Sequence, residues 1–233
     1  MSNARHNVFI FNYIKNNQND INYLTRTFTK YNCFVKEHKN LTYAEFKAAA
    51  DEIATANFTL FKYIVIIVLD NQNPYKHLIK TSDNKTVYIN QQLLTHIQQN
   101  KTLLRKQRLF LIQTNQNVIE KYKHYIPSEN ESTSKILYVG QTITLFALEP
   151  EERLTNYWKT PNAPVSPFIK AFCDNFDKYA DNLRINKIYD RIHHDMSNTE
   201  HTPIFDSNLN SNDDGIYGYA LEDHIKRDFF YNN

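Results

Sequence analysis

The chain has 233 residues, of which 41% are hydrophobic and 14% aromatic, and its formal net charge is +2. This size suits a single-core α/β domain, so we expect one domain over residues 1–233. Acidic and basic side chains are interspersed, which excludes the concentrated basic surface of a nucleic-acid-binding protein. The longest apolar run, Tyr63–Leu69, is too short to span a bilayer, so we expect no membrane insertion.

Two cysteines, Cys33 and Cys173, do not suggest a disulfide framework, and a reducing compartment is the simpler interpretation. The polar N-terminus does not resemble a secretory leader. We therefore expect a cytoplasmic protein. The bias toward Asn, Lys, Ile and Tyr, with only 3 glycines, is typical of an AT-rich genome such as that of a virus or a parasite.

In the first half of the chain, short apolar runs alternate with segments of helical periodicity. This alternation predicts a β-α-β architecture. The predicted strands are 7–13, 33–35, 63–69, 86–89 and 109–112, and the predicted helices begin at Asn19 or Asp20, at Thr42 and before Leu93.

Two of these segments carry strong local signals. Thr42 and Glu45 have the spacing of a reciprocal capping box, and Leu41 and Phe46 lie where a hydrophobic staple belongs. The segment 63–69 is apolar at every position, which predicts a central strand of a parallel sheet covered by helices on both faces.

The second half begins after a polar segment, 122–135, which is the best linker candidate. Beyond it, residues 142–148 predict a strand, and Ser166 followed by Pro167 predicts the start of a helix. The remaining predictions are a helix carrying Ile185, Ile188 and Ile192, a polar loop at 206–214 and a last strand at 217–225.

The order of these elements and several short sequence motifs resemble the caspase protease domain over residues 8–231. Arg108-Leu-Phe-Leu-Ile-Gln113 resembles the strand that carries the family's nucleophile, and Trp158 resembles the tryptophan that lines its substrate groove. The resemblance implies an α/β three-layer sandwich with a central, mainly parallel six-stranded sheet and helices on both faces. It also implies a large-subunit-like part, 1–121, an uncleaved linker, 122–135, and a small-subunit-like part, 136–233.

The resemblance fails at the catalytic positions. Where the family has Gln-Ala-Cys, this chain has Gln113-Thr114-Asn115, so Asn115 replaces the cysteine. Where the family's histidine follows the central strand, this chain has Asp70. A cysteine protease needs a thiolate and an imidazole, which an amide and a solvated carboxylate do not replace. We therefore expect a pseudo-enzyme that resembles catalytically inactive caspase homologues, such as the caspase-like proteins of insect large DNA viruses.

The substrate pocket also departs from the family pattern. The family holds its target aspartate with two arginines and a glutamine, and only the glutamine remains, as Gln113. The loop after the first strand offers Lys15, and Lys159 replaces the second arginine. Gln113, Trp158 and Lys159 either still hold a peptide or only line a vestigial groove. No aspartate lies between Asp83 and Asp174, so we expect the linker to stay uncleaved.

Three further features have open interpretations. His193-His194-Asp195 is a solvent-facing cluster rather than a metal site, and we expect no metal and no cofactor. The loop 206–214 is either a bait for a caspase or a flexible loop. The last strand either pairs with a partner or is an edge strand protected by charges. Its candidate partner-binding residues are Tyr217, Tyr219, Leu221 and Ile225.

The leading hypothesis is a regulator of apoptosis, most directly an inhibitor, that binds a host caspase or caspase adaptor, with a homodimer through the last strand as a further option. A second hypothesis is a caspase-fold scaffold unrelated to apoptosis. A third is a divergent hydrolase that uses Asp70 or Thr114.

Overall fold

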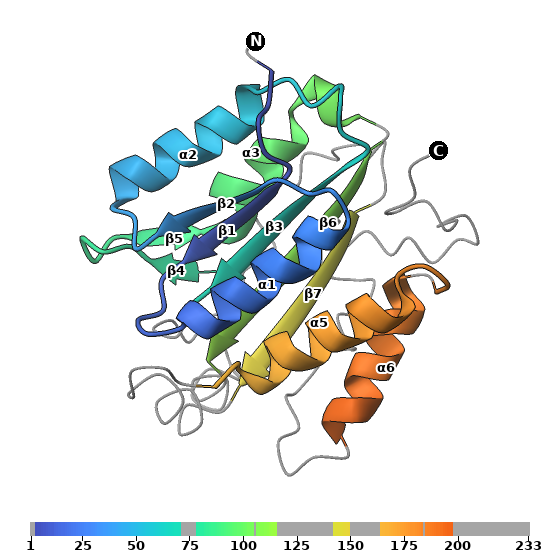
Figure 1. The fold of residues 1–233 in the computed structure, drawn as a ribbon. Coiled ribbons are helices and arrows are strands. Elements are labelled where there is room, and N and C mark those ends of the chain that lie inside the picture. Colours follow the sequence, from blue (N-terminus) through green and yellow to red (C-terminus); the bar gives the residue numbers. More distant parts are fainter. Residues whose placement is uncertain are drawn as a thin grey trace, which may run out of the picture.

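The computed structural model describes residues 3–70, 78–104, 106–115, 142–149, 164–183 and 185–197. Within these ranges five strands form one sheet in the order β2-β1-β3-β6-β7, and every neighbouring pair is parallel (Figure 1). The strands are β1 (Val8–Asn12), β2 (Val35–Lys39), β3 (Tyr63–Leu69), β6 (Gln107–Asn115) and β7 (Thr142–Glu149).

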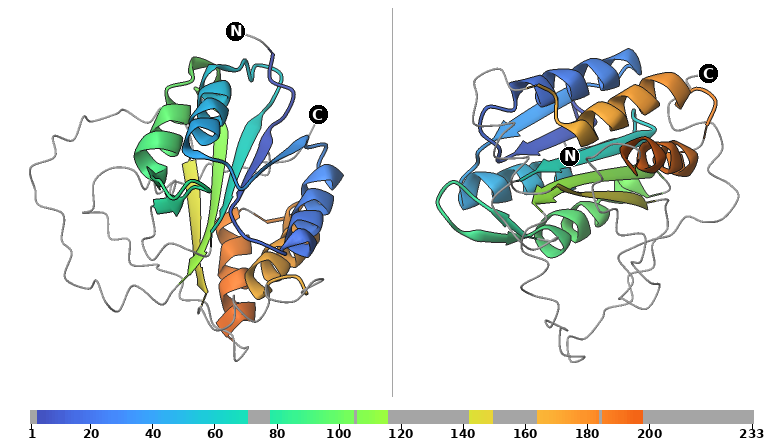
Figure 2. Two further views of the ribbon diagram at one scale, coloured as in Figure 1. Left: turned by 90° about the vertical axis from the view of Figure 1, so that its left-hand side faces the viewer. Right: turned by 90° about the horizontal axis from the view of Figure 1, so that it is seen from below.

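Helices cover both faces of the sheet, which confirms the predicted α/β three-layer class (Figure 2). One layer contains α1 (Gln18–Lys30), α5 (Pro167–Tyr179) and α6 (Ile185–Ser197), and the other contains α2 (Tyr43–Thr55) and α3 (Thr95–Gln98). A π-helix, Asn90–Leu94, leads into α3, and a 3-10 helix, Lys101–Leu103, follows it. Successive residues of a strand face opposite sides of the sheet. Val8 and Ile10 therefore pack in the α1 layer, while Phe9 and Phe11 pack in the α2 layer.

The central strand β3 lies between β1 and β6 and has neighbours on both edges and both faces. All seven of its residues are buried, as the continuous apolar run predicted. A polar side chain in the middle of this strand would lose its hydration among apolar neighbours, whereas the Tyr63 hydroxyl at its start donates to the Tyr31 carbonyl at 3.2 Å.

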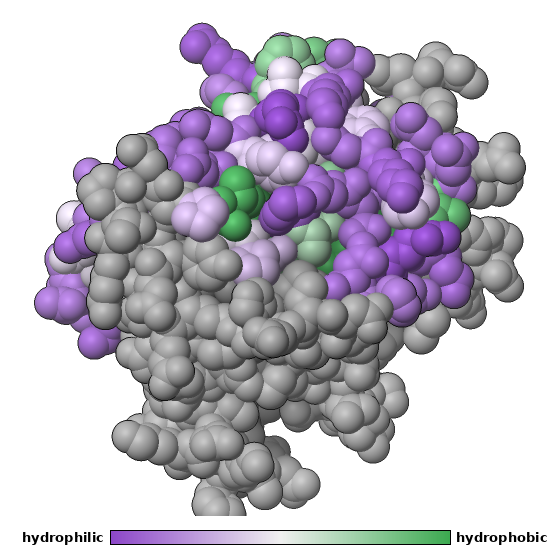
Figure 3. Space-filling model, turned by 60° about the horizontal axis from the view of Figure 1, so that its bottom comes forward, coloured by the Kyte–Doolittle hydropathy of each residue, from purple (hydrophilic) through white to green (hydrophobic). Residues whose placement is uncertain are grey.

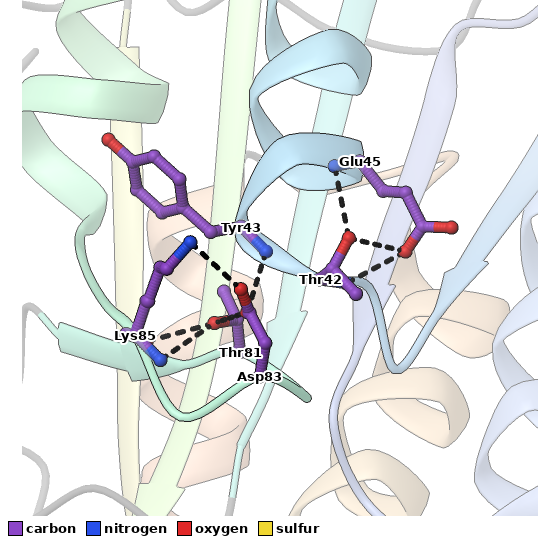
Figure 4. Close-up of polar contacts among 6 residues, drawn as sticks. All are labelled: Thr42, Tyr43, Glu45, Thr81, Asp83 and Lys85. Atoms are coloured by element: carbon purple, nitrogen blue, oxygen red, sulfur yellow. Dashed lines mark hydrogen bonds and ion pairs between the residues drawn. The ribbon is translucent and has the colours of Figure 1, made fainter.

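The capping box at the start of α2 is present, as predicted (Figure 4). The Glu45 N–H donates to Thr42 Oγ1 at 3.3 Å, and the Thr42 N–H donates to the Glu45 carboxylate at 2.8 Å. Leu41 packs against the apolar cluster that contains Phe46. The first turn of α2 is thus fixed by its own side chains.

A β-hairpin holds the same helix end from outside. Strand β4 (Leu78–Lys80) pairs antiparallel with β5 (Thr86–Tyr88), and Asp83 lies in the turn between them. The Asp83 carboxylate accepts from the Tyr43 N–H at 2.9 Å, from Thr81 Oγ1 at 2.6 Å and from Lys85 Nζ at 3.2 Å (Figure 4). The Thr81 hydroxyl and then the Tyr43 N–H lower the pKa of Asp83 to about 2. The strand predicted at 86–89 thus belongs to this hairpin, as β5, and not to the main sheet.

Two predicted boundaries are wrong. Helix α1 begins at Gln18 with Asn17 as its N-cap, not with Asn19 or Asp20 as cap. The predicted cap Asp20 instead lies inside the first turn, where its carboxylate accepts the Ser166 N–H at 2.6 Å. Asp20 thus bonds to a residue far away in the sequence, whereas the sequence suggested a local capping role.

Strand β2 begins at Val35, not at Cys33. It pairs only with β1 within the described sheet, so this edge position tolerates Lys36 and Glu37. Cys33 lies before the strand, and its Sγ is 3.0 Å from the Tyr63 hydroxyl.

The linker 122–135 and the predicted last strand 217–225 lie outside the described residues, so the sixth strand and the subunit-like boundaries stay predictions. Among the helices that the described ranges contain, none is long and apolar enough to cross a bilayer.

Replacing Thr42 with alanine should remove the side-chain acceptor for the Glu45 N–H and lower the free energy of unfolding by about 1 kcal/mol. Chemical denaturation with constant m-value measures this loss. The matched control is Thr55→Ala at the other end of the same helix, where the exposed hydroxyl donates to the Asp51 and Glu52 carbonyls and accepts from no backbone N–H of the first turn. Equal losses in the two variants would contradict a capping role for Thr42.

Buried His38 should make the protein less stable in mild acid. The imidazole is 9% exposed and stacks on Phe11 with centroids 5.0 Å apart. Burial, and then the Lys36 charge, lower the pKa of His38 from 6.5 to about 4. Between these pH values the unfolded chain binds a proton that the folded chain does not, so stability falls as pH drops from about 6.5 to 4.

His38→Phe keeps the aromatic stack and should remove this part of the pH dependence. The measurement is the free energy of unfolding at pH 7 and pH 5 for both proteins. An identical change in the variant and the wild type would show that His38 is not responsible.

Candidate functional site

Three buried polar side chains lie at the carboxyl ends of neighbouring strands, where parallel α/β sheets usually form their ligand-binding sites. Tyr13 follows β1, Asp70 follows β3, and Gln113 lies near the end of β6, with exposures of 3%, 1% and 0%. The Tyr13 N–H donates to the Leu69 carbonyl at 2.8 Å, and the Asp70 N–H donates to the Gln113 carbonyl at 3.0 Å. Main-chain bonds therefore fix all three positions relative to the sheet.

Asp70 is not solvated, contrary to the sequence prediction, since it is only 1% exposed. Asp70 directly follows the central strand β3 and therefore lies between the ends of β1 and β6. The sequence prediction assumed instead that a polar residue at a strand end faces water. Burial raises the pKa of Tyr13, and the Asp70 charge raises it further. Tyr13 is therefore a neutral phenol at physiological pH.

Gln113 connects the sheet to the helical layer through a polar chain. Its Nε2 donates to Ser166 Oγ at 3.4 Å, and the Ser166 N–H donates to the Asp20 carboxylate at 2.6 Å. Ser166 is the N-cap of α5 but makes no side-chain cap, and its hydroxyl accepts from Gln113 instead. This chain joins β6, α5 and α1, and Asp20 is 146 positions from its partner, so no local pattern could have predicted the contact.

The loop after β1 is closed by a second buried network. The Asn12 and Asn17 side chains exchange hydrogen bonds of 2.9 Å, and Asn12 also donates to the Glu37 carboxylate at 2.8 Å. Asn16, at φ 61, supplies the left-handed residue that this tight turn requires. Lys15, which the sequence suggested in place of an arginine, is exposed on this turn.

Both cysteines are free and buried away from the Asp70 position. Cys33 lies near the start of β3, beside Tyr63, at the opposite end of the sheet from Asp70. Cys173 is 0% exposed in α5 and lies beside Thr27 of α1. Burial raises the pKa of Cys33 to about 11 and raises that of Cys173 further. Both thiols are therefore protonated near neutral pH.

Other predicted site residues are only partly described. The Asn115 backbone pairs with Glu149 in the β6–β7 ladder, and its side chain is outside the description. The same applies to the whole of Trp158 and Lys159, and to the partner-binding candidates Tyr217, Tyr219, Leu221 and Ile225. The groove and the partner strand therefore remain predictions.

The predicted solvent-facing cluster on α6 is exposed at His194 and Asp195. Asp195 accepts from the Asn175 amide at 2.9 Å. No group of three or more His, Cys, Asp or Glu side chains with metal-binding geometry occurs among the described residues. On the face that Figure 3 shows, the described residues are mostly hydrophilic, with few hydrophobic ones among them.

Comparison with known structures supports the fold. The chain is similar to a solved structure described as pro-sf-caspase-1, with a TM-score of 0.61 and 16% sequence identity over 87% of this chain and 88% of that chain. At this identity the similarity shows the fold alone. No curated protein gives a significant match.

Comparison with protein families matches residues 7–213 to the caspase domain. The matched segment covers most of the 233 residues and includes every strand and helix described above. This chain therefore belongs to the caspase domain family.

Proposed function

We propose that this chain is a caspase-fold protein without protease activity, which binds an active caspase or a caspase adaptor and thereby inhibits apoptosis. The observation that carries the proposal is the placement of the thiols. The strand that corresponds to the family's nucleophile strand ends in Asn115, while Cys33 and Cys173 are buried elsewhere with raised pKa values. A protonated thiol inside a core is not a nucleophile toward a peptide bond.

The position of the family's histidine supports the same conclusion. By the sequence resemblance Asp70 corresponds to it, and Asp70 lies close enough to Tyr13 to affect the pKa of that phenol. A buried carboxylate beside a neutral phenol lacks the imidazole that gives a cysteine protease its proton carrier near neutral pH.

The residues expected to bind a substrate aspartate are also altered. Gln113 is fully buried and donates to Ser166, so this side chain serves an internal contact. Lys15 is exposed on a turn closed by the Asn12–Asn17 pair, and a lysine lacks the bidentate fork of an arginine. This supports loss of the aspartate-specific pocket in the proposal.

Inhibition would follow from mass action. A non-cleaving family member that occupies a surface of an active caspase removes active enzyme in proportion to its concentration and affinity. The groove around Trp158 and the strand 217–225 are the two candidate surfaces. A scaffold unrelated to apoptosis would use the same surfaces for other partners.

One observation favours a second candidate, a divergent hydrolase. Asp70 and Tyr13 are neighbouring buried polar groups at the carboxyl ends of the strands, where parallel α/β sheets usually form their sites. Hydrolysis of caspase or esterase substrates that disappears in Asp70→Asn or Thr114→Ala would support it against the leading proposal.

The thiols should be inert in the folded protein. Alkylation by iodoacetamide at pH 8 should be roughly a hundredfold or more slower than for a free thiol, because both cysteines are buried with raised pKa values. Mass spectrometry should show two alkylated cysteines after unfolding in guanidinium. The opposite outcome is a stoichiometric adduct of the native protein with an aspartyl chloromethyl ketone, which an active cysteine protease would give.

Mixing the purified protein with effector caspases of its host should lower peptide cleavage and give co-elution in size-exclusion chromatography. A second arm uses caspase whose cysteine is already blocked by an irreversible inhibitor. Co-elution in this arm would locate binding outside the caspase's active site. Unchanged cleavage and separate elution at micromolar excess would refute the proposal, and a pull-down from host cells without any cell-death protein would favour the scaffold.

A further inference from the structure

A hollow of about 420 Å³ lies between α5 and α6, the neighbouring helices at the lower right of Figure 1. This volume falls in the range of sites that bind small ligands or single side chains. It is separate from the strand-end cluster, since Asn175 and Tyr179 line it in the C-terminal part of α5, while Ser166 precedes the N-terminus of that helix, about 13–20 Å away along the axis. The hollow is lined by Asn175, Tyr179, Leu183, Lys187, Asp190, Arg191, His194 and Asp195.

Its central feature is an arginine stacked on a tyrosine. The Arg191 guanidinium lies 4.2 Å from the centroid of the Tyr179 ring, and its Nη1 donates to the Tyr179 hydroxyl at 3.3 Å. Lys178 approaches the same ring at 5.0 Å. Neither Arg191 nor Lys178 forms an ion pair with a carboxylate in the part of the chain that the structure describes. The Tyr179 hydroxyl accepts from Arg191, so its own proton can be donated to a ligand.

The protein contains the same arrangement a second time, and there a carboxylate completes it. Arg26 lies 4.2 Å from the Tyr23 ring, and the Tyr23 hydroxyl donates to the Asp174 carboxylate at 2.5 Å. The hydrogen bond from Lys170 and then the one from the Tyr23 hydroxyl hold the pKa of Asp174 below its usual value, and the Arg26 charge makes a smaller contribution. The tyrosine of an arginine-on-tyrosine pair in this chain thus donates to a carboxylate, with the arginine charge nearby and Lys170 as the ion-pair partner.

The charged side chains that line the hollow favour a ligand with a single negative charge. Asp190 pairs with Lys187 at 3.1 Å, and Asp195 accepts from Asn175 at 2.9 Å. These two lining carboxylates would repel a dianionic phosphate more strongly than a carboxylate, whose single charge Arg191 can neutralise. Leu183 adds an apolar wall beside the cations.

We propose that the hollow between α5 and α6 binds an acidic side chain of a partner protein, with Arg191 and Tyr179 contacting the carboxylate and Leu183 packing on an adjacent apolar residue. Charge-assisted hydrogen bonds from a guanidinium supply both affinity and orientation in such a contact. This surface does not depend on the proposed loss of protease activity.

The test is a titration of the ¹⁵N-labelled full chain with the probe peptide acetyl-Leu-Glu-Leu-amide, followed by NMR. Amide shifts should occur in α5 and α6 around Tyr179 and Arg191, with weak binding typical of one charge-assisted contact. The isosteric peptide acetyl-Leu-Gln-Leu-amide should bind at least about tenfold more weakly, the order expected for loss of that contact. Inorganic phosphate should bind more weakly than the glutamate peptide.

Arg191→Met and Tyr179→Phe should each weaken binding of the glutamate peptide by about tenfold. Arg26→Met is the matched control, because Arg26 stacks on a tyrosine at the same 4.2 Å but does not line the hollow. It should leave the affinity unchanged, and circular dichroism checks that each variant is folded. Equal binding of the two peptides, tighter binding of phosphate, absence of shifts, or equal weakening by Arg26→Met would each overturn the proposal.

Discussion

The two-sided burial of the central strands is the constraint on which the rest of the structure depends. Because β3 is covered by helices on both faces, its residues from Ile64 to Leu69 are all apolar, and its main chain is used by β1 and β6. Polar chemistry can therefore begin only where the strands end. That is where Tyr13, Asp70 and Gln113 gather, and their depth in the fold follows from the same covering layers.

The strand-end cluster joins the sheet to the helical layer. Here Gln113, Ser166 and Asp20 form a chain of internal bonds between the sheet and two helices. Polar residues that bond inward specify how the layers meet, and the cost of separating them in a low-dielectric interior is high. These positions therefore stabilise the packing of the sheet against α1 and α5.

Much of the fold could be predicted from the sequence because its signals are local. The apolar run at β3 and the Thr42–Glu45 spacing each determine a structure within a few residues. The errors arise where a distant partner decides. Asp20 looks like a helix cap but bonds to Ser166, and Asp70 looks like a solvated strand end but is enclosed by neighbouring strands. The Arg191–Tyr179 pair joins two helices whose contact has no local sequence signal.

The Asp83 carboxylate links a surface turn to the first backbone N–H of α2, a helix that is also fixed by its own cap. Two segments that are 40 positions apart thereby share one anchoring group. Amide hydrogens of the hairpin and of the first turn of α2 should then exchange with solvent through one joint opening event rather than two separate ones. A single exposed aspartate in this way extends the cooperative unit of the α2 layer out to the tip of the β4–β5 hairpin.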